Sequence, residues 1–123
     1  MNEKMSFVIT SCGRVDLLDR TLESFFKFNN FPIEAFYLTE DSIDENVYSK
    51  IKQKWGKKLN LLFNTKKKGQ IQSIVDVYKS IKTPYIFHCE DDWIYKRKNF
   101  IQDSLKILES DPKIIQVWLE SRE

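Results

Sequence analysis

The chain has 123 residues, of which 41% are hydrophobic and 31% are charged, and its formal net charge at pH 7 is +2. This length and composition predict a single folded domain over residues 1–123 and exclude a disordered chain. The small net charge does not by itself imply a nucleic-acid partner, and we expect none, although the lysines within residues 50–58 and 66–68 leave this alternative open. No apolar run reaches the length of a membrane span, and no secretory signal is visible, so we expect a cytoplasmic protein.

Five short apolar runs predict five β-strands, because each is bounded by polar or turn-forming residues. In chain order, the runs cover residues 6–10, 35–39, 59–63, 85–89 and 114–119. Between successive runs, apolar residues recur every three or four positions, which predicts four helices. Their stripes contain Leu18, Leu22, Phe25 and Phe26; Val47, Ile51 and Trp55; Ile71, Ile74, Val75, Tyr78 and Ile81; and Phe100, Leu105 and Leu108.

The alternation of strands and helices predicts the fold class. Strands that are joined through helices run parallel in one sheet, with right-handed crossovers and helices on both faces. We therefore expect a three-layer α/β domain with a mostly parallel sheet, in which ligands bind beyond the carboxyl ends of the strands. Mixtures of acidic, basic and small polar residues follow the first four predicted strands, at residues 11–14, 40–42, 64–70 and 90–92.

The fourth of these polar clusters is the most informative, because Glu90, Asp91 and Asp92 directly follow an apolar strand. Carboxylates grouped at one strand end supply the hard oxygen ligands that Mg²⁺ and Mn²⁺ prefer, especially where a substrate phosphate completes the coordination. The alternative is a solvated turn before a helix, where acids are also common. The sequence favours a metal-assisted site for a nucleotide diphosphate.

Several other kinds of site are excluded by the residues present. Cys12 and Cys89 form no paired motif, and we expect both to be buried free thiols. His88 and Cys89 are neighbours on a strand and point to opposite faces, so they cannot share a zinc ion. The glycine-rich motifs of dinucleotide-binding and ATP-binding proteins are missing. A phosphoacceptor receiver domain needs acids after the first and third strands, where residues 10–11 and 64–65 are not acidic.

In the same order along the chain, four short motifs resemble those of the GT-A fold nucleotide-diphospho-sugar transferases, most closely the family 2 glycosyltransferases. That family has a Leu-x-Ser pattern in its first helix, paired acids followed by Gly-Ser-x-Asp, an Asn-x-x-x-Gly element, and an Asp-x-Asp metal motif. The corresponding stretches are Leu22 to Ser24; Glu40 to Asp44, without the glycine; Asn64 to Gly69, a loose match with one extra residue between the asparagine and the glycine; and Glu90 to Asp92, which begins with glutamate. The resemblance spans nearly the whole chain.

The resemblance implies a glycosyltransferase of the hexosyltransferase type, which binds a nucleotide-diphospho-sugar, expected to be a UDP-sugar, and transfers the sugar to an unknown acceptor. It implies that Asp92 binds Mn²⁺ or Mg²⁺ directly, and that Glu90 acts through water or on the ribose side. Either Glu40 or Asp41 would accept a hydrogen bond from the base. The other nucleotide-sugar-binding residues that the resemblance implies are Thr10, Ser11, Arg14, Lys68, Gly69, Gln70 and Asp91.

Length is the main departure from the family pattern. Enzymes with this fold continue with an acceptor-binding half, from which inverting members draw their general base, so no catalytic base is assigned here. Two alternatives therefore stay open. The chain is either a non-catalytic nucleotide-sugar-binding module, or a donor-binding half whose site a partner chain completes. An open sheet edge would favour a homo-oligomer.

Overall fold

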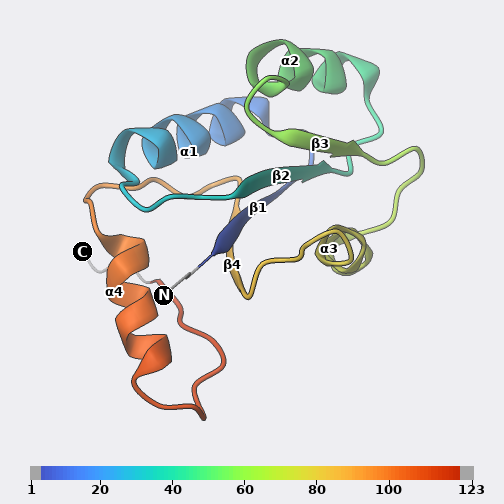
Figure 1. Cartoon of the computed structure of the whole chain (residues 1–123). Helices are drawn as coiled ribbons and strands as arrows, with labels where there is room; N and C mark the ends of the chain where they lie inside the picture. The colour runs from blue at the N-terminus through green and yellow to red at the C-terminus, as the bar shows by residue number, and fades with distance from the viewer. Residues whose placement is uncertain (1–3, 120–123) are drawn as a thin grey trace.

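The computed structural model describes residues 4–119, which contain one sheet of four parallel strands (Figure 1). The strands are β1 (Met5–Ser11), β2 (Ala35–Glu40), β3 (Asn60–Phe63) and β4 (Tyr85–Glu90), in the spatial order β3-β2-β1-β4. β1 is central and is buried along its whole length, as expected for a strand covered on both faces. The predicted α/β class with a parallel sheet is confirmed.

A helix follows each strand, namely α1 (Val15–Phe28), α2 (Glu45–Trp55), α3 (Gln70–Tyr78) and α4 (Phe100–Glu109). Figure 1 shows α1 and α2 on one side of the sheet and α3 on the other, so the domain has three layers. No helix among residues 4–119 is long and apolar enough to cross a membrane.

The main core lies between the sheet and α1, and it is largely aromatic. The ring centroids of Phe7 in β1 and Phe25 in α1 lie 4.4 Å apart. Phe100 brings α4 to the same cluster, with its ring centroid 5.9 Å from that of Phe25. All three side chains are buried, and burial of each contributes about 1.5–3 kcal/mol. This packing holds the strands in place, and it thereby fixes where their carboxyl ends meet.

The predicted strand over residues 114–119 is wrong. These residues are irregular, and the side chains of Ile115 and Trp118 are 90% and 79% exposed. A strand needs a neighbour to satisfy its backbone N–H and C=O groups, and this segment pairs with no strand among residues 4–119. The apolar pattern suits a strand, but the pattern does not supply the partner.

The predicted apolar face of α3 is wrong as well. Ile71 is 81% exposed, and the helix ends before Ile81. The buried residues of α3 are instead Ser73 and Val77. The hydroxyl of Ser73 accepts a hydrogen bond from the Asn64 side chain at 3.0 Å. A polar contact at the end of the sheet is therefore made on the buried side of α3, where the apolar stripe was expected.

The two cysteines differ in environment. Cys89 is buried in β4, as predicted, and burial raises its pKa to about 12. Cys12 is exposed, so the prediction of a buried thiol is wrong at this position. The strand ends at Ser11, and the following turn carries Cys12 out of the sheet.

Candidate functional site

A cavity of about 310 Å³ opens at the carboxyl ends of the strands. It lies where β1 sits between β2 and β4, so the chain leaves β1 toward one side of the sheet and later returns on the other. Such a switch in strand order is where open α/β sheets bind ligands. The cavity is lined by Thr10, Ser11, Cys12, Arg14, Thr39, Asp41, Lys67, Gly69, Gln70, Ser73, Glu90 and Asp91.

Asp41 anchors the loop between β3 and α3 to the end of β2. Its Oδ1 atom accepts from the backbone N–H of Lys68 at 2.9 Å and from the Asn64 side chain at 2.7 Å. Its Oδ2 atom accepts from the backbone N–H of Gly69 at 2.9 Å. Burial alone would raise the pKa of Asp41, but these three donors outweigh it and lower the pKa below its ordinary value.

Gly69 has the backbone conformation that this loop requires. Its φ angle is +82°, in the left-handed region that side chains other than glycine rarely adopt. The conformation turns its N–H group toward Asp41 just before α3 begins. The resembling Asn-x-x-x-Gly element therefore builds one wall of the cavity, with both Asn64 and Gly69 bonded to the same carboxylate.

Glu40 lies one residue before Asp41, and its side chain makes its hydrogen bonds on the opposite side of the strand. Its Oε1 atom accepts from the Ser11 hydroxyl at 2.6 Å. Its Oε2 atom accepts from the backbone N–H groups of Gly13 and Ser42, both at 2.9 Å. The side chain is 1% exposed and does not line the cavity. Of the two paired acids, only Asp41 reaches the cavity wall.

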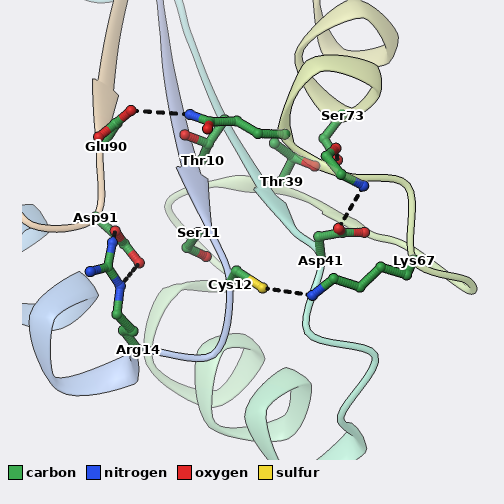
Figure 2. Close-up of a pocket in the computed structure, with 12 residues that line it drawn as sticks. Thr10, Ser11, Cys12, Arg14, Thr39, Asp41, Lys67, Ser73, Glu90 and Asp91 are labelled. Carbon is green, nitrogen blue, oxygen red and sulfur yellow. Dashed lines mark hydrogen bonds and ion pairs between the residues drawn. The ribbon is translucent and has the colours of Figure 1, made fainter.

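Arg14 and Asp91 link the start of α1 to the end of β4. The Arg14 guanidinium donates to both carboxylate oxygens of Asp91, with Nε 3.2 Å from Oδ2 (Figure 2). Thr21 in α1 also donates to the backbone carbonyl of Asp91 at 2.9 Å. Burial raises the pKa of Asp91, and the neighbouring guanidinium offsets part of that effect. Both residues of the pair line the cavity.

The other two acids of the cluster, Glu90 and Asp92, are exposed. Glu90 accepts a hydrogen bond from the Gln70 side chain at 3.0 Å, which joins β4 to α3. Among residues 4–119, no three His, Cys, Asp or Glu side chains converge as a metal site. Mg²⁺ and Mn²⁺ nonetheless often take only one or two protein carboxylates together with substrate phosphates and water. The hard oxygen donors of Glu90 and Asp92 fit that kind of site.

The three consecutive lysines at residues 66–68 contribute to the site in different ways, and the predicted contact, Lys68, is not the lysine whose side chain reaches the cavity. Lys68 offers its backbone N–H to Asp41, whereas its side chain forms an ion pair with Asp76 at 2.7 Å. Lys67 is the lysine whose side chain reaches the cavity, where its ammonium group donates to the Cys12 thiol at 3.3 Å (Figure 2). This contact raises the pKa of Lys67. The conformation of the loop decides which lysine points inward, and the run by itself does not reveal it.

The structure thus brings together most of the predicted site residues. Eight of them line one cavity, namely Thr10, Ser11, Arg14, Asp41, Gly69, Gln70, Glu90 and Asp91. Glu40, Lys68 and Asp92 lie next to it in sequence but are not among the lining residues. Four further lining residues were not predicted from the sequence, namely Cys12, Thr39, Lys67 and Ser73. Their only sequence signal is their position beside predicted strand ends or at the start of a helix.

Comparison with solved structures identifies the fold. The mannosyltransferase PcManGT from Pyrobaculum calidifontis, in complex with GDP-Man and Mn²⁺, is similar over 91% of this chain and 34% of its own, with a TM-score of 0.76 and 12% identity. TarS from S. aureus, in complex with UDP, is similar over 86% of this chain and 32% of its own, with a TM-score of 0.65 and 19% identity. Neither a protein-family model nor a curated protein sequence matches.

The chain therefore has the fold of the GT-A-type glycosyltransferases, as its motifs predicted. It spans about a third of the length of each of these two similar structures.

Proposed function

We propose that this chain binds a nucleotide-diphospho-sugar in the cavity at the carboxyl ends of β1, β2 and β4, as the donor-binding part of a glycosyltransferase. The observation that carries the proposal is the position of this cavity at the switch point of a GT-A-type sheet, with acidic, basic and small polar groups around it. Two structures with the same fold hold GDP-Man with Mn²⁺ and UDP, respectively.

The proposed nucleotide contacts follow from the lining residues. Asp41 is the proposed acceptor for a base N–H group, because its Oδ2 atom accepts a single hydrogen bond from the protein. Thr10, Ser11 and Arg14 would line the nucleotide pocket on the β1 side. The backbone and side chains of residues 68–70 would flank the base or the diphosphate. Asp91 would act together with Arg14, to which it is bonded.

We further propose that Asp92 and Glu90 hold Mn²⁺ or Mg²⁺ when the nucleotide diphosphate is present. Both carboxylates are exposed at the end of β4, and the phosphates would supply the remaining oxygen ligands. A metal ion bound there would stabilise the negative charge on the departing nucleotide. The uridine base is expected from the family resemblance.

A second candidate function is nucleotide-sugar binding without transfer by this chain alone. The chain covers about a third of each of the two similar glycosyltransferases, and no catalytic base is assigned among its residues. In this case, a partner chain would contribute the acceptor site, or the domain would only sense the donor. Release of free sugar or product on incubation with a UDP-sugar, Mn²⁺ and acceptor would exclude the sensor.

Calorimetric titration of UDP, with GDP for comparison, in Mn²⁺ and again in EDTA tests the donor site. We expect UDP binding in Mn²⁺ and a loss of affinity of about 10-fold or more in EDTA, because the diphosphate would lose its contacts with the metal ion and each 1.4 kcal/mol of lost binding free energy is about tenfold in affinity. Asp92→Asn should bind UDP equally weakly in both buffers. Asp111→Asn is the matched control, because Asp111 is an exposed acid beyond α4, and it should behave as wild type.

The two parts of the proposal fail separately. UDP affinity that is unchanged in Asp92→Asn would contradict the metal assignment and leave the nucleotide site standing. No binding of UDP or GDP by the folded wild-type protein in either buffer would contradict the nucleotide site itself. The acids after β4 would then act only as a polar turn before α4.

A further inference from the structure

Glu40 is a buried carboxylate that the proposed nucleotide contacts do not use. It is 1% exposed, and its three donors are the hydroxyl of Ser11 and the backbone N–H groups of Gly13 and Ser42. A carboxylate at such a position is costly to bury unless hydrogen bonds compensate for the lost water. These contacts satisfy both of its oxygens, and each contact reaches a segment that borders the cavity.

The Glu40 contacts fix the turn between β1 and α1. Gly13 has a φ angle of +81°, so the turn depends on a left-handed residue whose N–H group points to Glu40. The same turn lies beside Ser42, since a Cβ atom on Gly13 would be in ordinary van der Waals contact with that of Ser42, at 3.6 Å. Glu40 therefore holds the turn after β1, through Gly13, next to the residues that follow β2, through Ser42.

The turn that Glu40 holds carries three lining residues of the cavity. Ser11 and Cys12 come directly before Gly13, and Arg14 comes directly after it. Arg14 is held at its far end by Asp91, but its backbone position is set by the turn. A shift of this turn would move both the Ser11 hydroxyl and the Arg14 guanidinium relative to the other walls.

We infer that Glu40 is a positioning residue for the nucleotide site, which acts through the turn and does not contact the nucleotide. This inference rests on the proposed function. The two neighbouring acids divide the task, because successive side chains at a strand end point to opposite sides. Asp41 holds the loop before α3, and Glu40 holds the turn before α1. Together they fix two walls of one cavity from a single strand.

Two substitutions distinguish the effect of the length of the Glu40 side chain from the effect of its charge. Glu40→Asp keeps the charge but is one methylene shorter, so it cannot span to both Ser11 and Gly13. We expect its UDP affinity to fall by about 10-fold or more, because the displaced Ser11 and Arg14 side chains would lose contacts with the nucleotide and each 1.4 kcal/mol of lost binding free energy is about tenfold in affinity. Glu40→Gln keeps the reach. Its oxygen can accept from Gly13 and Ser42, and its amide can donate to the Ser11 hydroxyl, which can act as donor or acceptor. We expect wild-type affinity within about 3-fold.

The readouts must distinguish positioning from a general loss of stability. Leu105→Ala in α4 is the control, since Leu105 is buried in the core and is not a lining residue of the cavity. It should lower the melting temperature and leave UDP affinity unchanged. Hydrogen exchange of the Gly13 and Ser42 amides, measured by NMR without nucleotide, reports the contacts directly. Exchange should accelerate about 10-fold or more in Glu40→Asp and stay slow in Glu40→Gln.

The outcomes separate this inference from the function on which it rests. Failure of the wild-type protein to bind UDP or GDP overturns the proposed function and, with it, this role. Wild-type UDP affinity in Glu40→Asp, or unchanged exchange at Gly13 in that variant, overturns the positioning role alone. Weak binding in both Glu40→Asp and Glu40→Gln, with slow Gly13 exchange in Glu40→Gln, would mean that the nucleotide contacts Glu40 directly. Faster exchange and weaker binding in Glu40→Asp, with rescue by Glu40→Gln, supports positioning.

Discussion

Replacement of Asp41 by asparagine should destabilise the domain by an amount that depends on pH. The carboxylate accepts from the backbone N–H groups of Lys68 and Gly69 and from the Asn64 side chain, at 2.7–2.9 Å. In Asp41→Asn, one oxygen remains, and the new NH₂ group faces at least one of these donors. A hydrogen bond to a charged group contributes about 1.5–3 kcal/mol, so we expect a loss of about 2 kcal/mol at pH 7. With a urea dependence of about 2 kcal/mol per M, the midpoint should fall by about 1 M.

The sign of the pH dependence follows from the lowered pKa of Asp41. A carboxyl group whose pKa is lower in the folded state stabilises that state above the unfolded pKa, whose ordinary value is 3.8. This contribution disappears as the pH falls through the lower folded pKa. Urea unfolding of both proteins between pH 7 and pH 2.5 should therefore show the wild-type advantage shrinking below about pH 4. An advantage that stays constant over this range would refute the reasoning.

A comparison variant, Asp91→Asn, should show the opposite trend. Burial raises the pKa of Asp91 in the folded state, so its ionised form is less favourable there than in the unfolded chain. A raised folded pKa contributes stability at low pH that is lost as the pH rises. The wild-type protein should therefore gain relative to Asp91→Asn as the pH falls. Both substituted residues lie at the same edge of the sheet, and the two variants are distinguished by the direction in which their stability relative to the wild type changes with pH.

Two further predictions concern the fold. Phe25→Ala should lower the free energy of unfolding by about 3–5 kcal/mol, because Phe25 is fully buried against Phe7 and Phe100. The control is Ile115→Ala, at a 90% exposed position. It should change the free energy of unfolding by less than about 0.5 kcal/mol in the same urea titration. Asp44→Ala should cost about 1 kcal/mol, because Asp44 caps α2 by accepting from the N–H groups of Asn46 and Val47. Asp44→Asn should retain most of this stability, and equal losses in both variants would contradict the capping role.

The paired acids Glu40 and Asp41 were only partly predictable from the sequence. The motif predicts that Glu40 or Asp41 contacts the base, and both positions do lie at the end of β2. The sequence does not reveal which of the two faces the cavity, because that depends on the direction in which each side chain leaves the strand. The structure places Asp41 at the cavity and Glu40 in the protein interior. The tertiary structure thus decides which of the two acids faces the cavity.

The first four strands, their helices and the polar clusters at the strand ends were predictable, because hydrophobic periodicity and turn residues act over a few neighbouring positions. The parallel α/β class follows from the same local patterns, since alternating elements can form a sheet only through crossovers.

The remaining features depended on distant partners. Residues 114–119 have the pattern of a strand but no strand among residues 4–119 beside them, and the buried side of α3 carries Ser73, whose hydroxyl accepts a hydrogen bond from Asn64. Lys67 reaches the cavity, and the side chain of Lys68 does not, because the loop is held by Asp41. The local sequence determined which segments could form strands and helices. Contacts between distant segments decided which side chains became part of the core, which hold the loops at the sheet edge, and which line the cavity.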